Sequence, residues 1–212
     1  MDTRPSDLTV SAFIEELASD APTPGGGSAS ALAGAMGAAL VQMVVALTTR
    51  RADAVEVEDD LRELELAAAG FQSELLQLVE IDAAAYGSVI AARRLPRETE
   101  RERELRRAQI DAAVREATRS PLTIADRADA VLKLAERLAP IGSRNAISDA
   151  GVAGLLAAAA LRGAALNVRI NLPSLPEDEP LRRDAGERVD ELLIGLDERE
   201  AALRAAVAER LG

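Results

Sequence analysis

The chain has 212 residues, of which 48% are hydrophobic, 29% are charged and only 1% are aromatic, and its formal net charge is −11. This composition is typical of a single globular domain, and a core rich in alanine and leucine favours closely packed helices over sheets. The net negative charge and the scarcity of aromatic residues argue against nucleic-acid binding, which needs a basic face and aromatic stacking. The chain contains no cysteine and no histidine, which excludes disulfides, thiolate nucleophiles, imidazole bases and the usual zinc ligands.

The N-terminal region carries charges and lacks an apolar segment of signal-peptide length, which predicts a cytoplasmic protein. The uncharged run 21–49 is long enough to span a membrane, for which about 20 apolar residues are needed. Alanine, glycine and serine fill most of its first half and Gln42 interrupts its second half. A buried helix that packs through small residues is therefore favoured over a membrane span.

The hydrophobic periodicity predicts helices throughout and no strand. Pro121 is expected to begin a new helix, because proline suits the first turn of a helix and disrupts its interior. A break near Gly70 or Gly87 is the alternative to one helix of roughly 60 Å. The sequence thus predicts one all-α domain over 1–212, an antiparallel bundle of long helices at 8–19, 27–51, 53–94, 98–119, 121–138, 150–172 and 181–211.

Three consecutive glycines and a serine, Gly25, Gly26, Gly27 and Ser28, open the most apolar of these helices. Glycine allows close approach, and the first turn of a helix has free backbone N–H groups, so this segment can direct several donors at one ligand. The pattern predicts a site for an anion or a carbonyl group; the alternative is a tight turn. Neither a Walker loop nor a dinucleotide-binding fingerprint matches it.

Asp82 and Tyr86 are four residues apart on the expected helix 53–94, so they share a face, with only alanines between them. A carboxylate beside a bare alanine surface has room for a ligand. Burial would raise its pKa and make Asp82 a usable general acid and base in a protein without histidine. An exposed aspartate with no functional role is the alternative.

Polar residues also flank the second small-residue helix, 150–172. Asn145 and Asp149 precede it, where such residues commonly act as N-caps. Asn167 and Asn171 lie four apart near its other end, and their amides need partners from the backbone, a ligand or a neighbouring chain.

The basic residues that an anionic ligand would need gather around Pro96. They include Arg94 and Arg97, with Arg93 beside them. Simple solvation of these side chains at the surface is the alternative.

In this order and spacing the motifs resemble the formiminotransferase-cyclodeaminase C-terminal family over most of the chain, from about residue 8 to 205. The resemblance implies a helix bundle that dimerises, a tetrahydrofolate substrate with one or several glutamates, Asp82 as the catalytic residue, and no metal or further cofactor. Relatives often carry lysine where this chain has Arg97, which keeps the charge but changes the donor geometry. The motifs are Pro22–Ser28, Asp82–Tyr86, Arg94–Pro96, Asn145–Asp149 and Asn167–Leu172.

Two reactions stay open under this resemblance. A methenyltetrahydrofolate cyclohydrolase adds water to the methenyl carbon, and a formiminotetrahydrofolate cyclodeaminase closes the same ring with loss of ammonia. No formiminotransferase domain accompanies this sequence, which favours the cyclohydrolase. The resemblance further implies that the Gly25–Ser28 segment lies in one substrate pocket with Asp82. The other residues expected to bind the substrate are Tyr86, Arg94, Arg97, Asn145, Asp149, Asn167 and Asn171. A helical module that binds folate without turnover is the third hypothesis.

Overall fold

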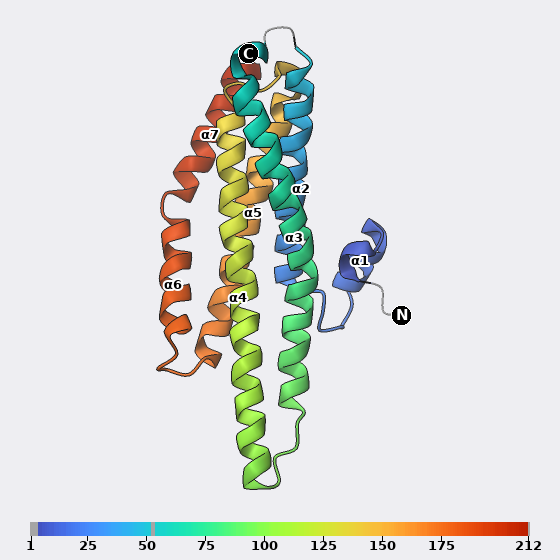
Figure 1. Cartoon of the computed structure of the whole chain (residues 1–212), viewed down its shortest axis with the longest axis vertical. Coiled ribbons are helices and arrows are strands. Elements are labelled where there is room, and N and C mark those ends of the chain that lie inside the picture. The colour runs from blue at the N-terminus through green and yellow to red at the C-terminus, as the bar shows by residue number, and fades with distance from the viewer. Residues whose placement is uncertain (1–3, 52–53, 212) are drawn as a thin grey trace.

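The computed structural model describes residues 4–51 and 54–211, and every regular element within these ranges is a helix, which confirms the expected all-α class. Four long helices form the bundle and alternate in direction (Figure 1). Two shorter helices cover one side of it, and α1 lies on the other side, next to α3 (Figure 1). The helices are α1 (Val10–Leu17), α2 (Gly26–Thr49), α3 (Glu58–Arg93), α4 (Glu100–Leu138), α5 (Ile147–Asn171), α6 (Pro180–Leu193) and α7 (Leu196–Leu211), with 3-10 turns η1 (Pro5–Asp7), η2 (Ala54–Val57), η3 (Arg144–Ala146) and η4 (Leu172–Ser174).

Small residues let the central helices approach closely. A Cβ atom on Gly37 of α2 would lie 2.9 Å from the carbonyl oxygen of Ala153 in α5. A Cβ atom on Gly154 would overlap the side chain of Leu203 in α7. Since real Cβ atoms do not come this near to a backbone oxygen, α2 packs against α5 at a distance that only glycine permits, whereas at Gly154 the Leu203 side chain would have to move.

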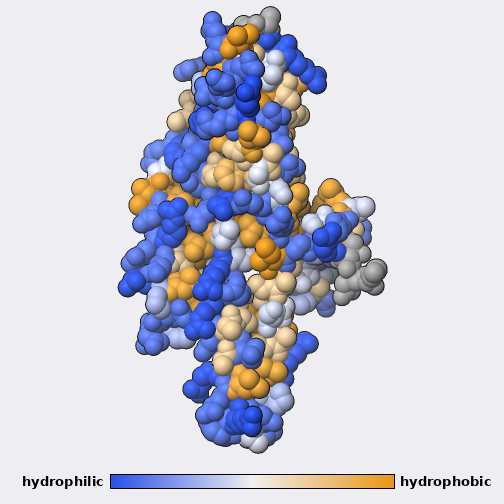
Figure 2. Space-filling view, viewed as in Figure 1, coloured by the Kyte–Doolittle hydropathy of each residue, from blue (hydrophilic) through white to orange (hydrophobic). Residues whose placement is uncertain are grey.

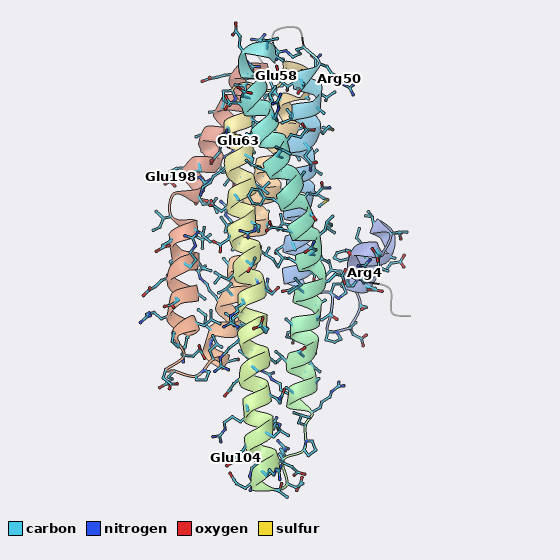
Figure 3. All side chains as sticks on the ribbon, in the orientation of Figure 1. Arg4, Arg50, Glu58, Glu63, Glu104 and Glu198 are labelled. Atoms are coloured by element: carbon cyan, nitrogen blue, oxygen red, sulfur yellow. The ribbon has the colours of Figure 1, made fainter. Side chains whose placement is uncertain are left out.

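The hairpin of α3 and α4 extends beyond the other helices (Figure 1). Its tip is closed by a capping box in which Thr99 and Glu102 satisfy each other's backbone N–H groups. Figure 2 shows apolar patches among the hydrophilic side chains of this extension. Figure 3 places Glu104 at the tip and Arg50 and Glu58 at the opposite end of the bundle.

Two expected helix boundaries are wrong. The segment 98–138 is not divided at Pro121, because α4 runs from Glu100 to Leu138 with this proline inside it. The segment 181–211 is divided, because Gly195 adopts a φ of 69° between α6 and α7, a left-handed conformation that favours glycine. Helix α3 continues through Gly70 and Gly87, so neither glycine breaks it.

Three stretches are long and apolar enough to cross a membrane by length and composition: Gly26–Thr49, Ala54–Arg93 and Arg144–Ser174. Between 39% and 56% of each apolar window is buried within the bundle, so much of this apolarity serves the core. Large apolar side chains nevertheless stay exposed on α2 and α5, and α2 contains no charged residue. We call this surface the α2–α5 face; its exposed residues are Met36, Met43, Leu47, Val152, Leu155, Leu166 and Ile170.

Candidate functional site

The N-terminus of α2 opens onto a cavity of about 250 Å³ that α3, α4 and α5 also line. Gly25 is the N-cap of this 24-residue helix and offers no side-chain cap. Gly26, Gly27 and Ser28 form its first turn, whose backbone N–H groups have no partner within the helix. The cavity therefore has the positive end of a long helix as one wall.

Asp82 of α3 projects into this cavity and meets the first turn of α2. The Ser28 hydroxyl lies 3.2 Å from Asp82 Oδ2 and 3.0 Å from the carbonyl oxygen of Val79. Because the hydroxyl has one hydrogen, it donates to only one of these oxygens at a time. It can donate to Asp82 when the carboxyl is charged. When the carboxyl is protonated, Ser28 can accept from it and donate to Val79. Ser28 thus suits both protonation states of Asp82.

Burial raises the pKa of the Asp82 carboxyl above its ordinary value, and this outweighs hydrogen bonds that favour the charged form. Those hydrogen bonds come from the hydroxyl and the backbone N–H of Ser28, and the Ser120 hydroxyl acts in the same direction. Among the described residues the buried Ser120 hydroxyl makes no hydrogen bond of good geometry. Ser120 was not singled out in the sequence, since only the neighbouring Pro121 marks its position. The site therefore holds a carboxyl that can retain a proton nearer neutral pH than an ordinary aspartate.

The glycines are needed for close approach. A Cβ atom on Gly27 would lie 2.2 Å from Oδ1 of Asp82 and 2.5 Å from Oδ2. A Cβ atom on Gly26 would lie 3.2 Å from Nδ2 of Asn167, whereas one on Gly25 would meet nothing within 4 Å. Gly27 in particular lets the carboxylate reach the end of α2.

Asn167, Asn171 and Tyr86 also line the cavity. Nδ2 of Asn167 donates to the carbonyl oxygen of Gly163 at 2.8 Å, and Nδ2 of Asn171 donates to that of Ala117 at 2.7 Å. The Ala117 carbonyl is the one that position 121 would normally satisfy, but Pro121 has no N–H. Asn171 thus supplies the hydrogen bond that the proline removes from α4.

Asn145 and Asp149 do not reach this cavity within one chain. They lie at the other end of α5, and 22 residues of helix separate Asn145 from Asn167, a distance of about 33 Å. Neither residue is the N-cap of α5, since that position is Ala146 and has no side-chain hydrogen bond. The expected grouping of these two residues with Asp82 is therefore not found within the chain, because α5 is a single uninterrupted helix.

The arginines around Pro96 also lie outside the cavity. Arg94 is the exposed C-cap of α3. Arg97 lines a separate hollow of about 280 Å³ at the hairpin tip, together with Arg103, Arg106 and Arg107. Neither Arg94 nor Arg97 therefore lines the cavity of Asp82, and their contact with a substrate stays a prediction. No group of three or more carboxylates that could hold a metal ion occurs in the described part of the chain.

Comparisons with known proteins identify a family model, curated relatives and a solved structure that match most of the chain. A family model described as formiminotransferase-cyclodeaminase matches residues 9–191. A methenyltetrahydrofolate cyclohydrolase from Methylorubrum extorquens is 45% identical over 184 residues, which cover 87% of this chain and 86% of that protein. A formimidoyltransferase-cyclodeaminase from Rattus norvegicus is 31% identical over 81% of this chain, which spans about a third (32%) of that relative. A crystal structure of formiminotetrahydrofolate cyclodeaminase from Thermotoga maritima matches with a TM-score of 0.84 and 25% identity, over 97% of this chain and 98% of that one.

Proposed function

Because the chain belongs to the formiminotransferase-cyclodeaminase family, we propose that it converts 5,10-methenyltetrahydrofolate and water to 10-formyltetrahydrofolate. The observation that carries this proposal is the half-buried Asp82, with its raised pKa, at the floor of the cavity. Of the two relatives described above, the one with the higher identity is a cyclohydrolase and matches over most of both chains, which favours this reaction over deamination.

Asp82 carries one proton through the reaction. Water adds to the methenyl carbon and gives a proton to the Asp82 carboxylate, which leaves a neutral carbon with a hydroxyl group between N5 and N10. Asp82 then returns the proton to N5 as the bond from carbon to N5 breaks. The hydroxyl loses its proton to solvent and becomes the formyl oxygen on N10. One water is consumed and one proton is released, and a carboxyl with a raised pKa suits both transfers.

Other side chains of the cavity bind and orient the substrate. Gly26 and Gly27 line the cavity, and the N–H groups of this first helical turn can serve as donors for a carbonyl oxygen of the pterin ring. The half-exposed ring of Tyr86 offers a flat apolar wall. The Asn167 and Asn171 amide oxygens are available as acceptors, since the amide nitrogens already bond to backbone.

The arginine hollow at the hairpin tip is our proposed site for the glutamate carboxylates of the substrate. Ile110, Arg107 and Arg103 lie 7, 10 and 14 residues before Ala117, so they fall near the same face of α4 as this cavity residue. Arg103 lies about 21 Å along the helix from Ala117. A substrate with several glutamates is long enough to reach it. A lower KM for such a substrate than for the monoglutamate supports this placement, and equal KM values contradict it.

The cyclodeaminase reaction is the second candidate, because most of the curated relatives carry that name. In that reaction N10 attacks the formimino carbon, and Asp82 would protonate the nitrogen that leaves as ammonia. Purified protein should be given methenyltetrahydrofolate and formiminotetrahydrofolate separately while the methenyl absorbance is followed. Loss of absorbance with the first substrate supports hydrolysis, and a gain with the second supports deamination. If the protein accelerates neither reaction, the remaining hypothesis is a helical module that binds folate without turnover.

We also propose that the protein is a homodimer that associates through the α2–α5 face. This face is long, free of charge on α2 and carries exposed methionine, leucine, valine and isoleucine side chains, as a surface between subunits does. Light scattering should give twice the chain mass of 22.3 kDa. Met43→Asp and Leu155→Asp should shift the protein toward monomer, while Leu105→Asp on the exposed hairpin should not. A monomeric native protein would refute the dimer.

A further inference from the structure

A buried hydroxyl on α4, that of Ser120, lies beside the site of the proposed reaction. The residue is 4% exposed, and within the part of the chain that the structure describes its hydroxyl makes no hydrogen bond of good geometry. Other buried hydroxyls on the long helices donate to the carbonyl four residues earlier, as Thr118 does to Val114 at 2.8 Å and Thr48 does to Val44 at 2.7 Å. Buried polar groups are nearly always paired, so the hydroxyl of Ser120 is available to a partner that moves.

The pairing of α3 with α4 places Ser120 at the level of Asp82. The two helices run antiparallel (Figure 1), and Arg127 of α4 forms an ion pair with Glu74 of α3. Ser120 precedes Arg127 by seven residues, and Asp82 follows Glu74 by eight. The same register therefore brings Ser120 and Asp82 together, since both helices rise equally per residue. Ser120 also lies three residues after Ala117, which lines the cavity, so both fall near one face of α4.

The Asp82 carboxylate needs a hydrogen-bond donor at the moment when its proton leaves. In the protonated state Ser28 accepts from Asp82 and donates to Val79, whose carbonyl oxygen is the nearer of the two acceptors, at 3.0 Å against 3.2 Å. After the proton has moved to the substrate, the Ser28 hydrogen still points to Val79, and a lone pair of its oxygen faces the new charge. A second hydroxyl with a free hydrogen can stabilise this charge before Ser28 turns.

We propose that Ser120 is a positioning residue for this reaction and that its hydroxyl donates a hydrogen bond to the Asp82 carboxylate whenever the carboxylate is charged. The inference rests on the proposed function. The O–H bond of Ser120 stays intact, and the proton moves only between water, Asp82 and N5 of the substrate. Only a small movement of either side chain is needed, because Ser120 is already near enough to favour the charged form of Asp82. Ser120 thus keeps Asp82 ready to accept the next proton from water.

Ser120→Ala removes the hydroxyl and leaves the rest of the side chain. The pKa of Asp82 should then rise, because the charged form loses a hydrogen bond. Carbon-13 NMR of the aspartate carboxyl groups follows this titration without turnover, and Asp82→Asn identifies the signal. The acid limb of the pH-rate profile should move to higher pH as well. At pH 7 kcat should fall about tenfold, the effect of losing a hydrogen bond to a charged group, while KM stays within about threefold.

The stability of this variant separates a role in the reaction from a role in the fold. The hydroxyl makes no hydrogen bond of good geometry within the described residues, so Ser120→Ala should not lower the midpoint of thermal unfolding. A purely structural serine would lower the midpoint and leave the titration of Asp82 unchanged.

Thr118→Val is the matched control. Thr118 is also buried on α4, but its hydroxyl donates to the carbonyl of Val114 in its own helix, and valine keeps its shape. This variant should leave the titration of Asp82 and the acid limb as in the native protein. A titration that does not move in Ser120→Ala, or that moves as far in Thr118→Val, would overturn the inference. A titration that moves only in Ser120→Ala, in a protein that accelerates neither folate reaction, would support the contact with Asp82 and refute the proposed function.

Discussion

Adding a single methyl group to Gly27 should separate the helix from the catalytic carboxylate. A Cβ atom there would lie 2.2 Å from Oδ1 of Asp82 and 2.5 Å from Oδ2. Contact distances of about 3.5 Å are needed, so the carboxylate must move by at least about 1 Å. A displacement of this size can cost about 100-fold in rate. Gly27→Ala should therefore lower kcat/KM about 100-fold.

The same substitution should not unfold the protein. Alanine is favoured over glycine within a helix by about 0.5 to 1 kcal/mol, which offsets part of the strain around Asp82. Gly25→Ala is the matched control, because its Cβ atom would meet nothing within 4 Å and its φ of −128° suits alanine. This control should stay within about threefold of native activity and lose at most about 1 kcal/mol of stability as a poorer cap. Gly26→Ala should fall between the two, since Asn167 must yield by only a few tenths of an ångström.

The assay is the steady-state loss of methenyl absorbance, with thermal unfolding measured on the same samples. The expected order of activity is Gly25→Ala, then Gly26→Ala, then Gly27→Ala. If Gly27→Ala kept native activity within threefold, the contact between α2 and Asp82 would have no part in the reaction.

Two further predictions concern titration. Ser28→Ala removes a hydroxyl that favours charged Asp82, so the acid limb of the pH-rate profile should move to higher pH; an unmoved limb would contradict the role of this hydroxyl. Arg199→Ala should lower the free energy of unfolding at pH 7 by about 1.5 to 3 kcal/mol, since it removes a charged partner 2.7 Å from the buried Asp129. Burial by itself would raise the pKa of Asp129, but Lys133 and Arg199 lower it overall. The stabilisation by this ion pair is thus present above the pKa that Asp129 has in the unfolded chain, and it is lost as the pH falls through the lower pKa of the folded state. The native protein and Arg199→Ala should therefore differ less in their free energy of unfolding by urea at pH 3 than at pH 7.

Most of the helices were predictable because they follow from local signals. The small residues of α2 and α5 and the absence of strand patterns indicate a bundle directly. The continuity of α4 was not predictable, since Pro121 is a helix breaker by local rules. The Asn171 amide, 50 residues from Pro121 in the sequence, donates to the carbonyl that the proline leaves without a partner, which offsets one cost of a proline inside the helix. A contact of this kind has no signature in a local window.

The sequence allowed us to predict which residues form the candidate site, but it did not show how the packing of the helices brings them together. Asp82, Tyr86 and the glycines meet because α2 begins partway along α3, which only the packing determines. Ser120 was missed because a serine within a charged helix gives no functional signal until its burial is known. Asn145 lies about 33 Å from the cavity since helix length fixes the distance.

The central claim is that Asp82 carries a proton in the hydrolysis of methenyltetrahydrofolate. Asp82→Asn keeps the shape of the side chain and removes its ability to accept that proton, so its kcat for loss of the methenyl absorbance tests the claim directly. The account predicts a fall of at least about 100-fold, with the fold and substrate binding retained. Native kcat in this variant would contradict it.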